Sequence, residues 1–387
     1  MHVEDFKKRA WAEVDLDALM HNFKEMKKMV KPETRLMVAV KANAYGHGAV
    51  MCARALLEAG ADYLAVATIE EALELRKAQI DAPILILGYV AKEDAQQLVN
   101  HNITATVYSV DFAKALSEAA IALNKKAKVH IKLNTGMERL GFSVDEIESI
   151  QSLAGLSGLD IEGLFTHLAC ADAEDSGSVH LQYERFIHVA ESLKAAGISI
   201  CLRHVLNSAG IFDFPQYQLD MVRPGIALYG YYPSTFIHTE RASLRPVLSF
   251  KSRIVHLHKA ACGAGISYGW TYKAKEPMCV ATVPVGYADG YNRQLSNKAQ
   301  MLVHNNRVPV IGRICMDQCM IDVTSVHTIH VGDEITLIGG DEAGITADEL
   351  ATLSNTISYE ILCAVGKRIP RLYLQNGKIV GVLNGFA

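Results

Sequence analysis

The feature that most constrains the fold is the regular alternation of short apolar runs with charged, helix-like segments through about the first 230 residues. Segments with helical periodicity, such as Ile69–Lys77 and Leu181–Lys194, lie between most of the runs. Strands that alternate with helices form βαβ units around a parallel sheet. Eight runs fit a (β/α)8 barrel of the TIM type better than an open sheet of five or six strands, so we predict an α/β fold that begins with such a barrel. The eight runs are Leu36–Val40, Tyr63–Ala67, Ile84–Leu87, Thr104–Tyr108, Val129–Leu133, Ile161–Thr166, His204–Leu206 and Leu219–Val222.

The pattern changes after about residue 240. Short β-rich runs separated by turn residues follow, with one helical stretch around Asp348–Leu353, and they predict a mostly antiparallel β domain. We therefore place the barrel at residues 1–240 and the β domain at residues 241–387, with the boundary within Pro233–Leu244. Trp11–Asp15 predicts a strand that could join either domain, the β domain included. The β-rich runs are Pro246–Leu257, Met278–Pro284, Gln300–Val303, Val308–Ile311, Cys319–Val323 and Glu334–Ile338.

Composition excludes several classes of protein. With 387 residues, half of them apolar, the chain can form two or three domains with sizeable cores. The 38 Lys and Arg against 42 Asp and Glu give a net charge of −4, which argues against a nucleic-acid surface. No stretch approaches the roughly 18 consecutive apolar residues of a membrane span. The first 30 residues carry no export signal, so we expect a cytoplasmic protein.

The eight cysteines show no paired C-x-x-C spacing. Cys315 and Cys319 are four residues apart, but the nearby histidines lack the spacing of a zinc finger. We therefore expect reduced thiols, no disulfide framework and no metal site.

Polar residues follow the ends of five predicted strands. In a barrel, the carboxyl ends of the strands converge on the face where active sites form. These positions carry Lys41, Lys132 with Arg139, His167, the loop Asn207–Gly210 and the loop that begins with Arg223.

The collection is cationic, and its Gly-bearing loops suit a phosphate bound by backbone N–H groups. A lysine at the end of a buried strand is useful as a Schiff-base former, because a lowered pKa supplies the free amine. Phosphate, lysine and arginine together point to pyridoxal phosphate.

Five motifs together strongly resemble those of the alanine racemase family, in order from about Trp11 to Tyr373. The resemblance implies a pyridoxal-phosphate-dependent isomerase that interconverts L- and D-alanine and supplies D-alanine for peptidoglycan. Two positions depart from the family pattern: Asn134 stands where Asp is common, and Ser358 where Pro is common. The motifs are Lys41–Gly48 (KANAYGHG), Thr135–Gly141 (TGMERLG), Arg223–Gly230 (RPGIALYG), Gly286–Gly290 (GYADG) and Gly312–Gln318 (GRICMDQ).

The resemblance implies that Lys41 binds pyridoxal 5′-phosphate covalently and that Arg223 faces its pyridine nitrogen. A permanent cation there disfavours protonation of the ring and weakens its pull on electrons, which should suppress side reactions. The other implied cofactor contacts are Tyr45, Arg139, His167, Asn207, Ser208, Gly225, Ile226 and Tyr359.

Racemisation removes the α-proton from one face and returns one to the other, so two acid–base groups on opposite sides perform it most directly. The resemblance assigns these roles to Lys41 and Tyr268. A free tyrosine has a pKa near 10, so we expect His167 to link Tyr268 to the cationic Arg223. In this family the tyrosine enters the site of the partner chain, and the resemblance therefore implies a homodimer with composite active sites.

The remaining implied residues surround the substrate. Arg139 and Met316 would contact it, and Cys315 and Asp317 accompany Met316. Lys132 resembles a lysine often carbamylated in this family, which would turn a cation into an anion that holds Arg139; an unmodified Lys132 paired with an acid is the alternative. The implied substrate-access corridor is Asp172, His204, Arg293, Arg313 and Ile357, each of which could instead form a surface ion pair.

Three other readings stay open at this point. A decarboxylase of the ornithine or diaminopimelate type shares the cofactor and the architecture, but it would not be expected to carry Gly265–Gly269 together with the Gly312–Gln318 motif. A non-catalytic single-barrel carrier of pyridoxal phosphate would end near residue 240. A barrel enzyme without the cofactor leaves Lys41 and the phosphate loops unexplained.

Overall fold

The computed structural model describes residues 5–339 and 344–385 and divides into two compact units. The barrel unit comprises Leu19–Ala44 and Ala49–Arg245. The β unit comprises the described residues up to Ala18, the short segment Tyr45–Gly48 and the described residues from Pro246 onward. The outer ends of the two predicted domains, residues 1–4 and 386–387, lie outside the described residues.

The barrel unit is built on eight parallel strands, in the order β10-β2-β3-β4-β5-β6-β8-β9, among the described residues. A parallel bridge between Asn207 and Arg223 joins the chain just beyond β9 to the chain just beyond β10 and so brings the two edges of the sheet together. The predicted barrel is therefore confirmed. The strands are β2 (Arg35–Ala39), β3 (Tyr63–Val66), β4 (Ile84–Ile86), β5 (Thr104–Val107), β6 (Ala127–Asn134), β8 (Leu159–Phe165), β9 (Leu202–His204) and β10 (Met221–Val222), with the short β7 (Phe142–Ser143) pairing with β6.

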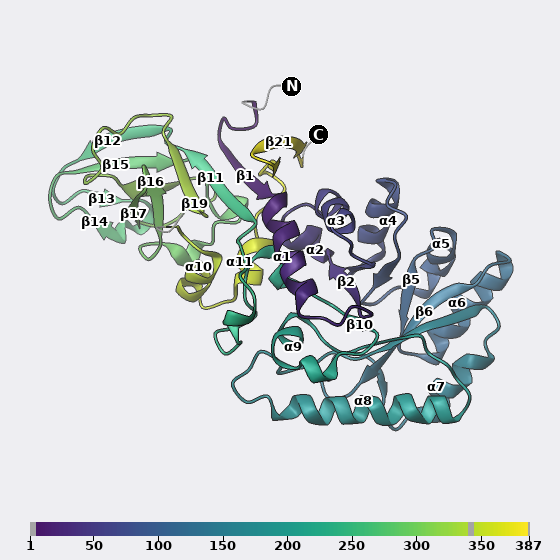
Figure 1. Ribbon diagram of the computed structural model, residues 1–387. Helices are drawn as coiled ribbons and strands as arrows, with labels where there is room; N and C mark the ends of the chain where they lie inside the picture. Colours follow the sequence, from purple (N-terminus) through teal and green to yellow (C-terminus); the bar gives the residue numbers. More distant parts are fainter. Residues whose placement is uncertain (1–4, 340–343, 386–387) are drawn as a thin grey trace. The chain divides into compact units, whose positions relative to one another are not determined.

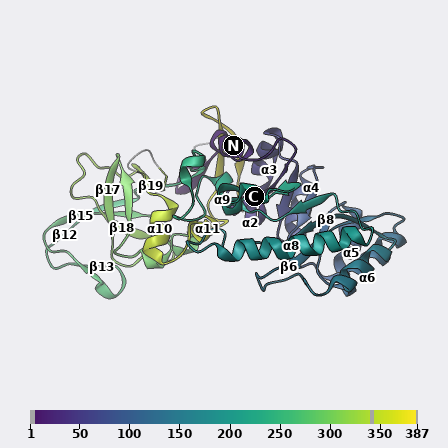
Figure 2. The same cartoon turned by 60° about the horizontal axis from the view of Figure 1, so that its bottom comes forward.

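Helices surround these strands (Figure 1). Every residue of β3, β4 and β5 is buried, as expected for parallel strands covered on both faces. Thr68 and Ser109 cap two of the helices by accepting the backbone N–H groups of Glu71 and Phe112. The helices are α1 (Leu16–Lys28), which leads into the unit, α3 (Ala49–Glu58), α4 (Ile69–Lys77), α5 (Ala95–Asn100), α6 (Val110–Ala122), α7 (Ile147–Ser152), the 19-residue α8 (Gly177–Ala195; Figure 2) and α9 (Ser208–Asp213).

The β unit contains a ten-stranded sheet in the order β12-β15-β18-β17-β16-β19-β11-β1-β20-β21. Neighbours pair antiparallel except β1 and β20, so the prediction of a mostly antiparallel domain is confirmed. A separate hairpin joins β13 (Gly265–Ile266) to β14 (Tyr272–Lys273). The ten strands are β1 (Ala10–Asp15), β11 (Leu248–Arg253), β12 (His256–Ala260), β15 (Met278–Val283), β16 (Gln300–Val303), β17 (Asn306–Ile311), β18 (Cys319–Asp322), β19 (Glu334–Ile338), β20 (Arg371–Gln375) and β21 (Lys378–Leu383).

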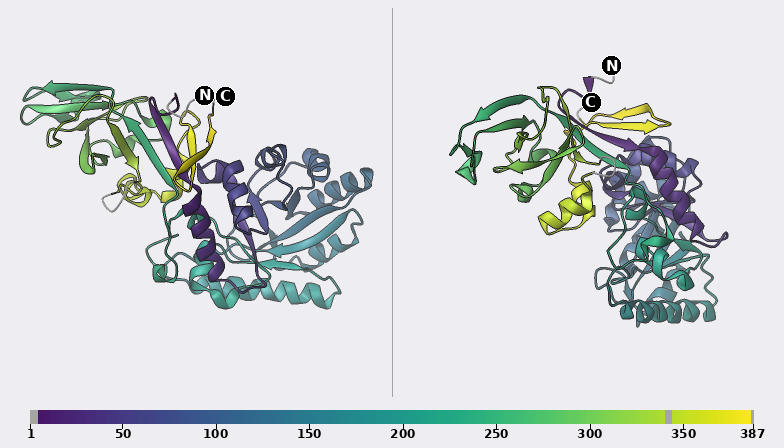
Figure 3. Two further views of the ribbon diagram at one scale, coloured as in Figure 1. Left: turned by 45° about the horizontal axis from the view of Figure 1, so that its top comes forward. Right: turned by 60° about the vertical axis from the view of Figure 1, so that its left-hand side comes forward.

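The N-terminal strand β1 belongs to the β unit, where it lies between β11 and β20 (Figure 3). Trp11 on this strand is fully buried, as are Phe250 of β11 and Tyr373 of β20. The exposure of β11 alternates residue by residue, the pattern of an antiparallel strand with one face on the core.

The structure differs from the sequence-based prediction mainly near the C-terminus. The single run predicted at Pro246–Leu257 forms two strands, β11 and the first part of β12. Between them the chain changes partner, since Ile254 N–H donates to the Asp333 carbonyl and Val255 N–H to that of Thr282. The helix predicted near Asp348 is α10 (Ala347–Ser354), whereas α11 (Ser358–Cys363), β20 and β21 were not predicted. Across the described residues, no helix is long and apolar enough to cross a membrane.

Candidate active site

Lys41 follows β2 at the carboxyl end of the strand, where its half-buried side chain begins an unusual turn. The next three residues, Ala42, Asn43 and Ala44, have φ of 52°, 53° and 52° and ψ of 49°, 47° and 53°. Left-handed helical geometry costs roughly 1–2 kcal/mol per residue for side chains with a Cβ. The Asn43 side chain accepts the backbone N–H of Ala49 at 2.9 Å and ties the turn to the start of α3. Lys41 is therefore held at the start of a strained segment, as is common at functional sites.

The two predicted phosphate loops lie side by side. Asn207 caps α9 by accepting the N–H of Gly210 at 3.0 Å, and its backbone bridges to Arg223. The buried Ser208 Oγ accepts the N–H of Gly225 at 2.8 Å. Ile226, also buried, begins the 3₁₀ turn that follows. These hydrogen bonds and the bridge bring together four of the predicted cofactor contacts: Asn207, Ser208, Gly225 and Ile226.

Arg223 lies in the barrel interior with both terminal nitrogens engaged. Its Nη2 donates to the carbonyl of Thr166 at 2.8 Å and to that of Val205 at 3.1 Å, and it lies 3.5 Å from His167 Nδ1. Nη1 contacts His204 Nδ1 at 2.7 Å. Burial lowers the pKa of Arg223 to about 9, so the guanidinium stays cationic at neutral pH.

Four basic side chains act electrostatically on His167, which follows the carboxyl end of β8. Burial lowers the pKa of His167 well below its ordinary value, and Arg223, Arg139, Lys132 and Lys41 lower it further. These residues come from the ends of four different strands, so the barrel assembles the cationic rim that the sequence predicts.

Lys132 lies on β6 with its side chain almost fully buried. Its Nζ donates to the carbonyl of Leu133 at 2.5 Å and lies 5.6 Å from the centre of the Phe165 ring. Burial, with Arg223 and Arg139 nearby, lowers the pKa of the Lys132 amine to about 7. Arg139 itself is exposed, in a loop that begins where Asn134 accepts the N–H groups of Gly136 and Glu138.

Two predicted phosphate contacts lie in the β unit. Tyr45 is buried, and its ring centre lies 5.9 Å from that of Tyr359 on α11. Burial raises the pKa of the Tyr45 hydroxyl, which therefore stays protonated and able to donate a hydrogen bond. The pair brings together two tyrosines that are more than 300 residues apart in the sequence.

Tyr268 lies in the loop between β13 and β14 with 71% of its surface exposed. Positive φ at Ser267 (60°) and Gly269 (70°) presents the ring outward. A Cβ on Gly269 would lie 3.1 Å from Arg313 Nη1, so the Arg313 guanidinium packs beside the Tyr268 loop. Ser267 Oγ donates to the carbonyl of Arg313 at 2.6 Å.

Met316 is also exposed, and the chain around it is fixed by the motif that begins at Gly286. The backbone N–H groups of Tyr287 and Ala288 donate to the carbonyls of Cys315 and Met316 at 3.1 and 3.0 Å. A Cβ on Gly286 would lie 2.2 Å from the Cys315 carbonyl oxygen, so this contact requires glycine. Cys315 Sγ lies 3.5 Å from Ser267 Oγ, which connects the Met316 segment to the Tyr268 loop.

The predicted corridor residues do not share one environment. Asp172 and Arg293 are exposed, and Ile357 is exposed just before α11. Asp317, which is predicted to accompany Met316, forms an exposed ion pair with Arg368 at 2.8 Å. His204 differs from the exposed residues: its side chain is fully buried in the barrel and contacts Arg223 Nη1 at 2.7 Å, and its place in the corridor stays a prediction.

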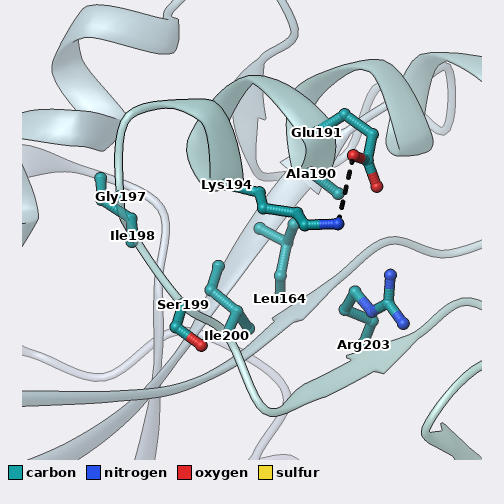
Figure 4. A pocket seen from close by; sticks show the side chains of 9 residues that line it. All are labelled: Leu164, Ala190, Glu191, Lys194, Gly197, Ile198, Ser199, Ile200 and Arg203. Carbon is teal, nitrogen blue, oxygen red and sulfur yellow. Dashed lines mark ion pairs between the residues drawn. The ribbon is translucent and has the colours of Figure 1, made fainter.

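A pocket on the barrel unit lies away from these residues. Figure 4 shows it at the C-terminal end of α8, with an ion pair of 3.8 Å between Lys194 and Glu191 at its rim. Its lining contains none of the predicted site residues, so we do not assign it to the site. The lining residues are Leu164, Ala190, Glu191, Lys194, Gly197, Ile198, Ser199, Ile200 and Arg203.

Sequence reasoning missed four polar residues that support the site. His130, Glu162 and Thr166 lie on or beside buried strands, and Glu71 lies on α4. A signal existed for His130, because it interrupts an apolar run two residues before Lys132 and therefore faces the same side of the strand. Glu71 has the spacing of a capping box from Thr68, yet its carboxylate bonds elsewhere.

A parallel barrel with a lysine, an arginine and phosphate-type loops at its strand ends, followed by an antiparallel β unit, defines a two-domain barrel enzyme. Comparison with known proteins specifies the family. Residues 14–233 match the model of the alanine racemase N-terminal domain, and residues 247–373 match that of the alanine racemase C-terminal domain.

Relatives match over nearly the whole chain. The alanine racemase of Desulforamulus reducens is 46% identical over 95% of this chain and 100% of its own length, and that of Methanococcus maripaludis is 46% identical over 94% and 98%. The solved alanine racemase of Clostridium difficile superimposes with a TM-score of 0.95 at 40% identity, covering 98% of this chain and 99% of its own. That of Bacillus anthracis with bound L-Ala-P has a TM-score of 0.92 at 38% identity over 98% and 99%.

The chain belongs to the alanine racemase family. The family resemblance and the enzyme class inferred from the motifs are thereby confirmed.

Proposed function

We propose that this enzyme interconverts L- and D-alanine with pyridoxal 5′-phosphate as its cofactor. The observation that carries the proposal is the set of basic side chains around His167, with the buried Arg223 3.5 Å from its ring and Lys41 at the start of a strained turn. In a bacterial cell the D-alanine formed would supply peptidoglycan synthesis in the cytoplasm.

The donor set of the barrel unit fits a phosphorylated aldehyde. Lys41 supplies a primary amine for the aldehyde carbon. Ser208 Oγ already accepts an N–H group from Gly225, so its own proton is available to a phosphate oxygen. The surrounding cations balance the charge of a phosphate. We propose that Asn207, Ser208, Gly225 and Ile226, with Tyr45 and Tyr359, hold the phosphate.

When bound, pyridoxal phosphate would act as an electron sink that makes the α-proton of an amino acid acidic. Arg223 is cationic and donor-only, so it would leave the ring nitrogen facing it unprotonated. We propose that Arg139 and Met316 orient the substrate. Lys41 and Tyr268 are proposed to hold and move the proton on opposite faces of the α-carbon.

We further propose a homodimer whose sites use residues of both copies. Large apolar side chains are exposed on the β unit, with exposed fractions of 71% for Tyr268, 68% for Trp270, 53% for Met316 and 60% for Ile357. Tyr268, Trp270 and Met316 lie on adjoining segments, since Ser267 Oγ lies 3.5 Å from Cys315 Sγ, and exposed apolar side chains that lie together mark interaction surfaces. Sedimentation of the holoenzyme tests the proposal: a mass of twice 42.3 kDa is expected, and a monomer with full activity would contradict it.

Exchange of the α-proton with deuterated solvent tests the reaction. Incubation of L-alanine with the holoenzyme in D₂O should replace the α-proton by deuterium and form D-alanine, whereas Lys41→Ala should do neither. Formation of ethylamine and CO₂ instead would establish a decarboxylase.

A further inference from the structure

A row of polar side chains runs through the interior of the barrel from Arg223 toward the amino ends of the strands. Arg223 Nη1 contacts His204 Nδ1 at 2.7 Å, and His204 Nε2 contacts His130 Nδ1 at 2.8 Å. His130 Nε2 lies 3.5 Å from Glu162 Oε2. The arginine and the two histidines are buried, and the Glu162 side chain is 19% exposed. The row thus joins a buried arginine at the carboxyl ends of the strands to a carboxylate through two buried histidines.

The two ends of the row determine where the protons lie. Arginine only donates hydrogen bonds, so His204 Nδ1 must accept one and carries no proton. A neutral His204 then has its proton on Nε2 and donates to His130 Nδ1. His130 in turn carries its proton on Nε2, which lies 3.5 Å from Glu162 Oε2 without hydrogen-bond geometry; the ionised carboxylate, an acceptor only, attracts the N–H electrostatically. Only one pair of tautomers suits both the donor Arg223 and the acceptor Glu162: His204 and His130 are each protonated on Nε2.

The surroundings keep the histidines neutral and the carboxylate charged. Burial lowers the pKa of His130 and, more strongly, that of His204, and Arg223 lowers both further. The contact with His130, together with the hydrogen bond from Tyr63, lowers the pKa of Glu162 to about 2. The charged and titratable groups that act on the row are Arg223, Lys128, Lys132, Glu162 and Tyr63.

Packing fixes the row laterally. The His204 ring stacks on Phe165 with a centroid distance of 4.8 Å and an interplanar angle of 4°. Tyr63 donates to Glu162 Oε2 at 2.9 Å and contacts Thr104 Oγ1 at 2.6 Å, which orients the carboxylate toward His130. Lys128 Nζ lies 3.6 Å from the other carboxylate oxygen.

We propose that Glu162 is a positioning residue: it accepts the proton-bearing end of the histidine pair, fixes both tautomers and thereby orients the Arg223 guanidinium toward the cofactor ring. With the opposite tautomers, His204 Nδ1–H would face an Arg223 N–H at 2.7 Å, a contact between two donors. The orientation toward the ring rests on the proposed function. The tautomers themselves depend only on the residues of this chain.

Nitrogen NMR of the ¹⁵N-histidine-labelled holoenzyme reads the tautomers directly. We expect His204 and His130 each to be protonated on Nε2 and bare on Nδ1. Either ring protonated on Nδ1, or charged at neutral pH, would overturn the proposal whatever the activity. If these tautomers were found but alanine were not racemised, the proposed function would fail and the tautomer assignment would stand.

Three variants test the part played by Glu162. Glu162→Leu removes the acceptor and should shift the His130 Nε2 resonance and reduce kcat roughly five- to tenfold, with KM for alanine changed less than about twofold. Glu162→Gln keeps an acceptor oxygen and should stay within about twofold of the wild type. Asp160→Asn changes an exposed carboxylate on the same strand, two residues before Glu162, and should leave the resonances and kcat unchanged. An unchanged His130 resonance and kcat in Glu162→Leu would overturn the role of Glu162.

Discussion

The Glu71 carboxylate accepts the backbone N–H of Ala42, the residue after Lys41, at 2.6 Å. Its other oxygen accepts the N–H of Ala67 at 2.7 Å, so a side chain on α4 joins two strand-end segments. Ala42 begins the left-handed turn, and this contact holds the strained backbone on which the lysine depends.

Glu71→Ala should therefore displace Lys41 and lower activity, while the free energy of unfolding of the barrel changes little. We expect kcat/KM for alanine to fall roughly 10- to 100-fold, because misplacement of a reacting group by about 1 Å costs on that order. Steady-state kinetics measures the effect. Glu74→Ala, an exposed position on the same helix, should change little. Equal kinetics for both variants would show that the turn is held without Glu71.

Tyr268→Phe should remove one of the two proposed proton-transfer groups while leaving the cofactor bound. Loss of a positioned acid–base group costs about 10²–10⁴-fold in rate. Racemisation from either enantiomer should fall by that order, while the visible absorption of the bound cofactor stays. Tyr272→Phe, on the neighbouring strand β14, serves as the matched variant and should keep its rate. Near-normal turnover in Tyr268→Phe would refute the two-base assignment.

Lys132 should make stability depend on pH between about 7 and 10. Its pKa is about 7 in the folded chain, against about 10.4 for an unfolded lysine. The unfolded chain thus binds more protons in this range, so the free energy of unfolding rises with pH. The rise due to Lys132 should be about 2 kcal/mol from pH 7 to 9 in CO₂-free buffer.

Denaturant unfolding of the wild type and Lys132→Met at the two pH values isolates this effect. The variant should lose that part of the rise, whereas Lys128→Met, a partly exposed position on the same strand, should retain it. Parallel pH profiles for wild type and Lys132→Met would contradict the assignment of an uncharged Lys132 amine above pH 7. A carbamylated Lys132 would give that result.

Asp289 should be important for the stability of the β unit. Its fully buried carboxylate accepts two bonds from Arg9, at 2.8 and 3.0 Å, and the N–H of Gly286 at 3.1 Å. Asp289→Ala should lower the free energy of unfolding by roughly 2–4 kcal/mol, since it leaves donors of the Gly286 motif unpaired. Asp317→Ala breaks an exposed ion pair and should cost about 0–1 kcal/mol. Similar losses in the two variants would contradict this account.

The barrel could be predicted because its strands are buried on both faces. Runs such as Ile84–Leu87 are continuous apolar segments. Lys41 and His167 follow other runs of this kind and lie at the carboxyl ends of their strands, as expected. The hairpin of β20 and β21 was missed, although Asn376-Gly377 carries the signal of a two-residue turn. The apolar run of β20 is only three residues long, Leu372–Leu374, and Gly381 interrupts that of β21.

The supporting residues of the site could not be predicted in the same way. The family resemblance placed His204 in the substrate-access corridor, whereas in the barrel it lies between Arg223 and His130. Glu71 bonds to Ala42, 29 positions away, and Glu162 lies 3.5 Å from His130, 32 positions away. Pattern and spacing specify which face a side chain takes, but the partner across the barrel follows only from the closed three-dimensional structure.

The most direct test of the central claim follows the circular dichroism of alanine in the presence of the holoenzyme, starting separately from the L- and D-enantiomers. Because the two enantiomers have equal free energies, racemisation must bring both signals to zero at the same equilibrium, with total alanine unchanged. A signal that persists, or one that falls only as alanine is consumed, would contradict the proposed reaction.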